Sequence, residues 1–372
     1  MKFMQETTMT RLATLQSMLR QNGVDAVALG PGPHMAYIAD VHPHADERPC
    51  LLIATPSGAG VLMPELNADE MRRQTDLPFF TWSDATGPQA ALAALIQSLG
   101  IEKGTKLVQV DETMRADFAL LVIEALGSPK AGFAAESVGR MRLSKDEAEK
   151  AEILRNAEID DRAMEAAFAA IRPGVTERQI ADAARAVFEE AGATPLFTIV
   201  GAGGNGAFPH YATGDQPVAV GDAIVMDIGA RSGAFSSDLT RMAFVGEPSA
   251  EYRKVHAVVE AAVQAACAAA RPGVAAKDVD AAARGVITAA GYGPYFTHRT
   301  GHGLGLEGHE PPYLTSTSET ILEEGMVFSI EPGIYLQGKF GIRLEEIVIL
   351  EADGPRIVSR LPRDVFVAPT DA

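Results

Sequence analysis

Four acidic residues lie in or beside apolar stretches that are typical of β-strands. Asp227 lies near the end of the stretch AIVMDIG at 223–229, and Asp238 follows 11 residues later, directly before LTRMAFV. Glu331 follows VFSI, and Glu345 precedes EIVIL. An ionised carboxylate on a buried strand is costly unless an opposite charge or a bound cation compensates it. These four positions are therefore the first candidates for chemistry.

Two interpretations of the four acids have to be weighed. Taken singly, each could be a strand-edge acid that pairs with Arg241 or Arg343. Taken together, four carboxylates that converge in one place need cations to stay ionised. Two divalent ions about 3.5–4 Å apart can share a hydroxide and polarise a carbonyl group, as in two-metal hydrolysis. We expect this second arrangement.

Histidines in glycine-rich segments complete the candidate site. Residues 300–313 read TGHGLGLEGHEPPY, and their glycines argue against a helix and allow close approach of the backbone to a ligand. His302 is the expected imidazole ligand. His309 is expected on the wall of the site, facing His210 of the segment NGAFPH. His298 receives no assignment.

The expected ligand set indicates the class of metal. Four carboxylates and one imidazole form a hard, oxygen-rich site. Such a site favours manganese or a similar first-row divalent ion, with zinc and cobalt as alternatives.

An internal repeat explains how these residues could meet. Residues 171–192 and 270–291 are identical at ten of 22 positions with an offset of 99, and the same offset relates His210 to His309. A second pair of segments relates Asp227 to Glu331 with an offset of 104. Two copies are too few for a solenoid, so we expect a pseudo-twofold domain with a site where its halves join.

The N-terminal part reads as a separate α/β domain that ends near residue 137. Apolar stretches at 25–30, 50–54, 61–63 and 107–110 predict strands, and 88–99 and 116–126 predict helices. Ser144 with Glu147 three residues later predicts a capping box, which opens a long helix running towards Ala170. A second domain is expected from about residue 141.

Composition limits the classes of function. The net charge is −17, so nucleic acid and anionic membrane surfaces are not expected partners. Two cysteines exclude a disulfide framework. The N-terminus lacks the apolar core of a signal peptide, and no apolar run reaches about 18 residues, so we expect a cytoplasmic protein.

With these residues in place, the chain resembles the creatinase, aminopeptidase P and prolidase family, which has the pita-bread fold. The resemblance covers almost the whole chain and implies an α+β protein, with a creatinase-like domain at 1–137 and a pita-bread catalytic domain at 141–372. All five metal-ligand positions of the metallopeptidase members are present, as Asp227, Asp238, His302, Glu331 and Glu345.

The resemblance also implies roles for these residues. Asp238 and Glu345 would bridge two ions, Asp227 would hold one of them, and His302 with Glu331 would hold the other. His210 and His309 would contact substrate and stabilise the tetrahedral intermediate, while Glu331 assists proton transfer. We also expect Arg343 to contact substrate. The implied reaction is hydrolysis of the bond preceding proline in a small peptide with proline second.

Three further expectations accompany this resemblance. Some relatives are lyases or amidohydrolases, so turnover of a small zwitterionic metabolite is the alternative activity, and a non-enzymatic binding module is a third. Glu307-Gly308 departs from the Asp and β-branched residue of many members, which could reshape the pocket wall. A homodimer is implied, in which the loop 31–49 of one subunit could close over the partner's site.

Overall fold

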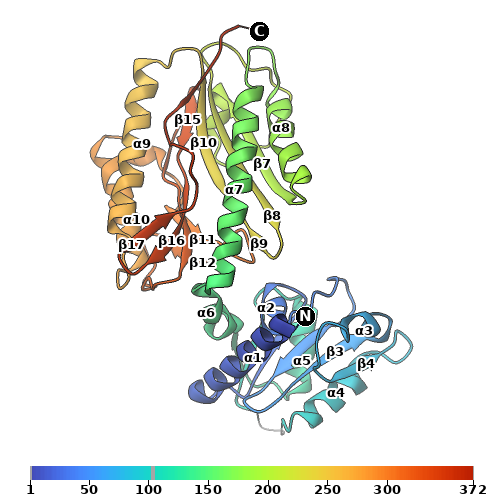
Figure 1. The fold of residues 1–372 in the computed structure, drawn as a ribbon. Coiled ribbons are helices and arrows are strands. Elements are labelled where there is room, and N and C mark those ends of the chain that lie inside the picture. The colour runs from blue at the N-terminus through green and yellow to red at the C-terminus, as the bar shows by residue number, and fades with distance from the viewer. Residues whose placement is uncertain (1, 102–104, 372) are drawn as a thin grey trace. The chain divides into compact units, whose positions relative to one another are not determined.

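The computed structural model describes residues 2–101 and 105–371. The chain divides into two compact units, Met1–Arg142 and Leu143–Ala372 (Figure 1).

The first unit is built on a six-stranded sheet with the order β4-β3-β2-β1-β5-β6. Strand β1 pairs antiparallel with β2, and β2 with β3, whereas the remaining neighbours are parallel. The strands are β1 (Ala26–Leu29), β2 (Leu51–Ala54), β3 (Ala59–Pro64), β4 (Phe79–Trp82), β5 (Leu107–Val110) and β6 (Lys130–Phe133). The helices are α1 (Lys2–Asn22), α2 (Pro33–Ala39), α3 (Glu65–Met71), α4 (Gln89–Ser98), α5 (Ala116–Ala125), the 3-10 turn η1 (Ala134–Glu136) and α6 (Val138–Leu143).

Apolar residues from the sheet and from α4 and α5 form the core of this unit. Leu92 and Leu95 of α4 and Phe118 of α5 pack with buried residues of β1, β2 and β5. The strands predicted at 25–30, 50–54, 61–63 and 107–110, and the helices predicted at 88–99 and 116–126, are all observed within a few residues of their expected ends.

The second unit holds two larger sheets and a two-stranded one. Their strand orders are β18-β10-β8-β7 with β9 beside β8, then β12-β11-β13-β16-β17, and β14-β15. The strands are β7 (Thr194–Ala202), β8 (Ala223–Ser232), β9 (Phe235–Ser236), β10 (Leu239–Val245), β11 (Gly301–Gly303), β12 (Glu310–Leu314), β13 (Val327–Ile330), β14 (Gly333–Leu336), β15 (Phe340–Arg343), β16 (Glu346–Glu351), β17 (Gly354–Ile357) and β18 (Phe366–Ala368). The helices are α7 (Glu147–Ala170), α8 (Glu177–Glu190), α9 (Ala250–Ala269) and α10 (Ala276–Ala289), with 3-10 turns η2 (Gly203–Ala207) and η3 (Gly293–Tyr295).

The predicted repeat is visible in the backbone of this unit. Gly174 donates from its amide to the carbonyl of Val218, and Gly273 donates to Leu322, each over 2.8 Å. These pairs are related by the same offsets, 99 and 104, that relate the repeated sequences. In both halves two helices are followed by antiparallel strands. The pseudo-twofold prediction is therefore confirmed at the level of hydrogen bonds.

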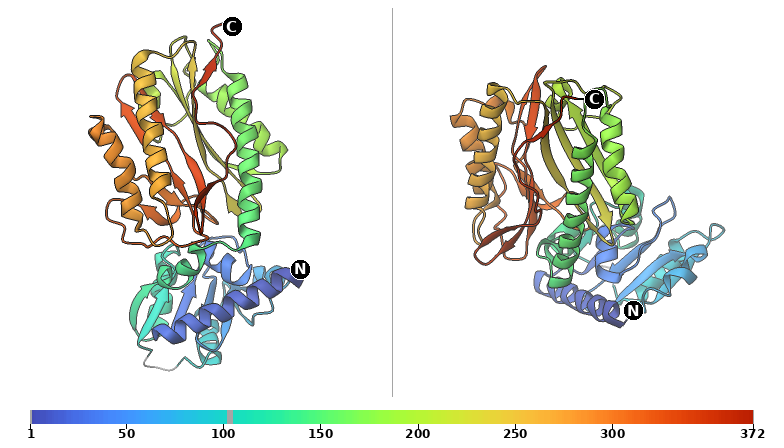
Figure 2. Two further views of the ribbon diagram at one scale, coloured as in Figure 1. Left: turned by 60° about the vertical axis from the view of Figure 1, so that its left-hand side comes forward. Right: turned by 45° about the horizontal axis from the view of Figure 1, so that its top comes forward.

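Helices cover the two outer sides of the strands in the second unit, as Figures 1 and 2 show. The apolar faces of α7 and α8 pack on β7, β8 and β10, and those of α9 and α10 pack on strands of both halves. Apolar side chains thus fill the two helix–sheet layers. Among the described residues, no helix combines the length and apolar character needed to cross a membrane.

The start of the long helix differs from the prediction. The helix begins at Glu147, and its capping box is formed by Asp146 and Glu149 rather than by Ser144 and Glu147. Ser144 instead forms an isolated antiparallel bridge with Met326, which keeps it in extended backbone. The cap therefore forms two residues later, where an Asp-x-x-Glu pattern provides the same chemistry.

Candidate metal centre

The five predicted ligands lie in strands or directly beside them. Asp227 is within β8, and Asp238 immediately precedes β10. His302 is the middle residue of β11, Glu331 directly follows β13, and Glu345 directly precedes β16. The register pairs Asp227 with Thr240, and the amide of Glu345 donates to the carbonyl of Thr240 over 3.3 Å. This bond joins the two halves of the repeat at the site.

The ligand atoms of these five residues gather in overlapping groups. Asp227, Asp238 and Glu345 each offer an atom within 4.8 Å of the others, and so do His302, Glu331 and Glu345. Asp238 also groups with His302 and His309. Glu345 is common to the first two groups. Asp238 belongs to the group with Asp227, and its Oδ2 lies 3.7 Å from Nε2 of His302, which belongs to the group with Glu331.

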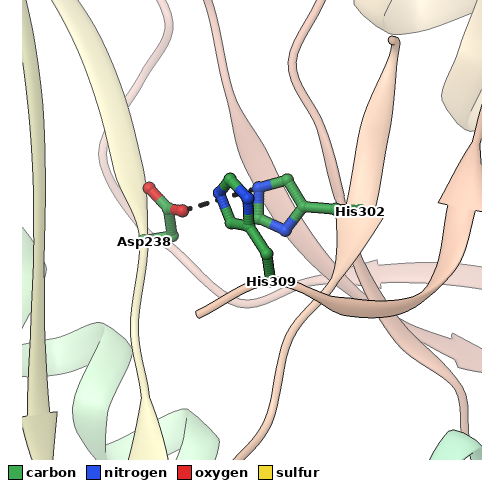
Figure 3. A group of neighbouring side chains, drawn as sticks. All are labelled: Asp238, His302 and His309. Carbon is green, nitrogen blue, oxygen red and sulfur yellow. Dashed lines mark ion pairs between the residues drawn. The ribbon is translucent and has the colours of Figure 1, made fainter. Parts of the chain in front are cut away.

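The tautomer of His302 suits a ligand. Its Nδ1 lies 3.0 Å from the carbonyl oxygen of Gly303, which can only accept, so Nδ1 carries the proton of the neutral ring. Nε2 then presents a lone pair towards Glu331 Oε1 at 3.2 Å and Asp238 Oδ2 at 3.7 Å. Figure 3 shows the Asp238 carboxylate facing this ring. A lone pair facing two carboxylate oxygens is repulsive without a cation between them.

Unpartnered carboxylate oxygens provide an independent test of whether a metal fits. Oδ1 of Asp227 and Oε1 of Glu345 are buried and have no hydrogen-bond partner among the described residues. The other oxygen of each group accepts from protein, Asp227 Oδ2 from Arg343 and Glu345 Oε2 from Thr240 over 2.7 Å. Buried oxygens with free lone pairs are what a divalent cation requires, so the residues present fit a metal centre.

The electrostatics of the centre agree with this interpretation. Burial raises the pKa of Asp238 well above its usual value, and the charges of Glu345 and Asp227 raise it further. Burial likewise raises the pKa of Glu345, with additional contributions from Glu331 and Asp227. Burial alone would also raise the pKa of Glu331, but without a cation a protonated His302 would donate to this carboxylate, and that hydrogen bond and charge lower its pKa to about 2. The crowded carboxylates need added positive charge.

Arg343, predicted to contact substrate, is almost fully buried and donates to protein groups. It is 3% exposed, and Nη2 donates to Asp227 Oδ2 over 2.5 Å. Nε donates to Thr240 over 3.1 Å, and Nη1 donates to the Tyr335 hydroxyl over 2.8 Å and to the carbonyl of Pro209 over 3.2 Å. Through Pro209, the residue before His210, Arg343 therefore links Asp227, a predicted metal ligand, to the segment of a predicted substrate histidine.

His309 lies beside His302, the predicted imidazole ligand. The rings of His302 and His309 have centroids 3.8 Å apart, and both rings are drawn in Figure 3. Arg299 donates to Nδ1 of His309 over 2.9 Å. Burial, with smaller contributions from His302, Arg299 and His210, lowers the pKa of His309 to about 4. The exposed His210 therefore shares the electrostatic environment of His309.

His298, for which the sequence alone indicates no role, lies beside Tyr335 at the candidate site. Its Nδ1 lies 2.7 Å from the carbonyl of Arg299, so Nδ1 carries the proton of the neutral ring and Nε2 accepts from the Tyr335 hydroxyl at 2.8 Å. Burial lowers the pKa of His298 to about 4. Both ring nitrogens are thus used within the protein. Its position four residues before His302 was the cue available in the sequence.

The glycines around His302 serve packing of strands. A Cβ on Gly301 would collide with the carbonyl oxygen of Ser329, and one on Gly303 would collide with the carbonyl oxygen of Pro311. Strand β11 lies between β12 and β13, so these glycines let the neighbouring backbones close around His302. The glycines at 301 and 303 therefore allow a close approach of neighbouring strand backbone, whereas the sequence alone predicts a close approach to a ligand.

Comparison with known proteins agrees with both units. The model of metallopeptidase family M24 matches residues 151–352, and that of the creatinase/prolidase N-terminal domain matches residues 11–143. The chain is 34% identical to the probable dipeptidase PepE of Mycobacterium tuberculosis, over 99% of this chain and 98% of that one. It is 32% identical to the Xaa-Pro dipeptidase of Pyrococcus horikoshii, over 93% of this chain and 95% of that one.

Solved structures show the same architecture. The dipeptidase PepE from Mycobacterium ulcerans superposes with a TM-score of 0.93 at 32% identity, covering 98% of this chain and 99% of that one. The prolidase from Thermococcus sibiricus superposes with a TM-score of 0.89 at 32% identity, covering 96% and 98%. The predicted α+β architecture of a creatinase-like unit followed by a pita-bread unit is confirmed. The chain therefore belongs to metallopeptidase family M24 and carries a creatinase/prolidase N-terminal domain.

Proposed function

We propose that this protein hydrolyses the peptide bond preceding proline in small Xaa-Pro peptides, with two divalent metal ions. The observation that carries this proposal is the convergence of five side chains in overlapping groups whose ligand atoms lie within 4.8 Å. The names of its relatives support the substrate class, since the proteins of Pyrococcus horikoshii and Lactobacillus delbrueckii are Xaa-Pro dipeptidases.

We assign the ligands from their grouping. Asp238 and Glu345 would bridge the two ions, because Glu345 belongs to both three-residue groups and Asp238 reaches towards His302. Asp227 would complete one ion, and His302 with Glu331 the other. When bound, the ions supply Lewis acidity at the scissile carbonyl and lower the pKa of a water molecule. The oxygen-rich ligand set favours manganese.

The histidines would act as donors to the substrate. A guanidinium can only donate, so Nδ1 of neutral His309 accepts from Arg299 and the ring proton is on Nε2. That N–H can stabilise negative charge as it develops on the carbonyl oxygen. We propose His210 as a second substrate contact, positioned through the bond from Arg343 to Pro209. Glu331 would accept and return the proton during bond cleavage.

A substrate screen on reconstituted protein tests this function. The purified chain is stripped with a chelator, loaded with Mn²⁺, and incubated with a panel of Xaa-Pro dipeptides and tripeptides, while the release of products is followed by mass spectrometry. We expect two equivalents of metal per chain, cleavage before proline, and loss of cleavage after chelation. The panel also determines the residue preferred before proline and whether longer peptides are accepted.

Asp238→Ala is the matched control for the screen, since it removes one expected bridging carboxylate. We expect this variant to bind less than two equivalents of metal and to lose activity by several orders of magnitude. Full metal loading without any cleavage across the panel would end the proposal. So would cleavage that is unaffected by chelation.

We also propose a homodimer in which segment 40–49 approaches the partner's site as a lid; the first part of the expected loop 31–49 is instead helix α2. The loop carries His42 and His44, and Arg48 fixes its end by donating to Asp84 over 3.0 Å. Light scattering on the purified protein tests the dimer. A monomer at all concentrations used in the activity screen would remove both the dimer and the lid.

A further inference from the structure

Two oppositely charged side chains are buried against each other at the edge of the candidate site. Lys145 Nζ donates to Glu310 Oε1 over 2.8 Å, and the two side chains are 2% and 3% exposed. They are 165 residues apart in sequence. Lys145 directly precedes the residue that caps α7, and Glu310 directly follows His309. The pair thus connects the start of a long helix with a residue adjoining the metal centre.

The backbone of Lys145 is firmly held. Its amide donates to the carbonyl of Gly325 over 2.8 Å, and Gly325 in turn donates to Leu350 of β16 over 2.8 Å. Its ammonium also donates to the carbonyl of Leu143 over 3.3 Å. The backbone of Lys145 is therefore fixed and connected through Gly325 to β16, which Glu345 directly precedes.

The Glu310 carboxylate organises the loop between the two histidines. Oε2 accepts from the amide of Glu307 over 3.3 Å. A Cβ on Gly305 would overlap this carboxylate, so the loop closes directly over it. The carbonyl of Gly305 accepts from Ser236 over 2.8 Å on the other side of the loop. The carboxylate is thus the centre around which residues 303–310 fold.

Burial of this pair calls for an explanation other than stability. Removing two charges from water costs about as much free energy as their mutual attraction returns. An apolar pair of similar volume would therefore stabilise the protein at least equally. What an apolar pair would lack is a fixed direction. A charged hydrogen bond sets both the distance and the orientation of the Glu310 carboxylate, and with it the backbone of the preceding residue.

We propose that the Lys145–Glu310 pair is a positioning device that holds the 303–310 loop, and thereby His309, over the metal centre. This inference rests on the proposed function for its catalytic readout. Neither side chain belongs to the groups of candidate metal ligands found among the described residues. It acts on the reaction through His309, whose Nε2–H must point at the reacting carbonyl.

Three variants test the inference: Glu310→Gln, Lys145→Met, and the two combined. Glu310→Gln removes the charge, and we expect kcat on an Xaa-Pro dipeptide to fall about 10- to 100-fold with KM little changed and two metal equivalents retained. Each single variant leaves one buried charge unpaired and lowers the melting temperature. The combined variant should regain stability while kcat stays low, because the directional bond is still missing.

A double-mutant cycle with His309 distinguishes positioning from general support of the fold. In a His309→Ala background the Glu310→Gln change should lower kcat by less than about twofold, because the group that it positions is already absent. Hydrogen exchange measured by mass spectrometry supplies a readout that needs no substrate. Peptides covering residues 303–310 should exchange faster in Glu310→Gln than in the parent protein.

Glu260→Gln is the control, since Glu260 of α9 pairs with Arg363 over 2.7 Å and is not among the residues of the loop or the centre. We expect it to lower stability and leave kcat unchanged. Additive losses in the His309 cycle, unchanged exchange in the loop, or a fall in stability without a fall in kcat would each overturn the inference. A parent protein that cleaves no Xaa-Pro peptide would instead sink the proposed function, and the exchange arm would still decide whether the pair holds the loop.

Discussion

Arg343 donates a hydrogen bond to Oδ2 of Asp227 over 2.5 Å, while Oδ1 of the same carboxylate is buried without a partner. One oxygen of a predicted metal ligand is therefore oriented by protein, and the other is left for a cation. Metal centres commonly orient their ligands in this way, through partners outside the coordination sphere.

The first prediction concerns this orientation. Arg343→Lys keeps the positive charge but cannot donate in the directions of Asp227, Tyr335 and Pro209 together. We expect metal affinity to fall by about 10- to 100-fold, as is usual when such a partner is lost. Titration of the stripped protein with Mn²⁺ in a calorimeter measures this change. Arg356→Lys, at an exposed pair with Glu351, should bind metal like the parent.

The second prediction separates stability from activity at Asp238. Burial and the neighbouring carboxylates raise its pKa, so the ionised side chain is unfavourable in the metal-free protein. Asp238→Asn removes that charge at almost the same volume. We expect the metal-free variant to be more stable by on the order of 1–2 kcal/mol and to be inactive with metal. Urea unfolding in chelator, paired with the activity assay, checks both; a destabilised metal-free variant would contradict the electrostatic account.

The third prediction compares two glycines of the same segment. A methyl group on Gly301 meets the Ser329 carbonyl, whereas one on Gly308 meets nothing within 4 Å. Gly301→Ala should cost about 1–3 kcal/mol or more and displace His302. Gly308→Ala should leave stability within about 0.5 kcal/mol of the parent.

Gly308→Val extends this comparison to specificity. The side chain would enter open space beside His309, so the fold should tolerate it while the preference among Xaa-Pro substrates changes. Thermal unfolding and the peptide panel provide the two measurements. If Gly301→Ala and Gly308→Ala were equally stable, the prediction would be wrong, because the backbone around Ser329 would then move aside for the new methyl group at little cost.

The fourth prediction is a pH dependence of stability at His256. Burial in α9 lowers its pKa, and its Nε2 lies 3.1 Å from the carbonyl of Arg363. A lowered pKa in the folded state means that the unfolded chain binds the proton more readily. The contribution of His256 to the free energy of unfolding is therefore fully present above its pKa in the unfolded chain, about 6.5. This contribution is lost as the pH falls towards and through its lower pKa in the folded protein.

His256→Gln tests this assignment, because Gln keeps a donor for the Arg363 carbonyl without titrating. Urea unfolding from pH 7.5 down to pH 5 should show a steeper loss of stability in the parent than in this variant. His44→Gln, in an exposed loop, should follow the parent curve. Parallel curves for the parent and His256→Gln would refute the prediction.

Many features of this protein could be predicted from the sequence, because they depend on local apolar patterns or on the internal repeat. Apolar periodicity predicted four of the six strands in the sheet of the first unit, and helices α4 and α5, within a few residues. Acids that interrupt apolar strands, in two related copies, predicted that Asp227, Asp238, Glu331 and Glu345 belong together, since burying an ionised carboxylate is costly wherever the strand lies. The structure brings these acids and His302 to one place.

Only the tertiary structure decided features that depend on contacts between distant segments. Ser144 and Asp146 both have a glutamate three residues later, and the bridge from Ser144 to Met326 determines which of them caps the helix. Likewise, no local pattern could show that Lys145 meets Glu310, or that Gly301 accommodates the Ser329 carbonyl. Directional contacts of this kind exist only once the chain has folded, because each partner's position is set by different strands and helices.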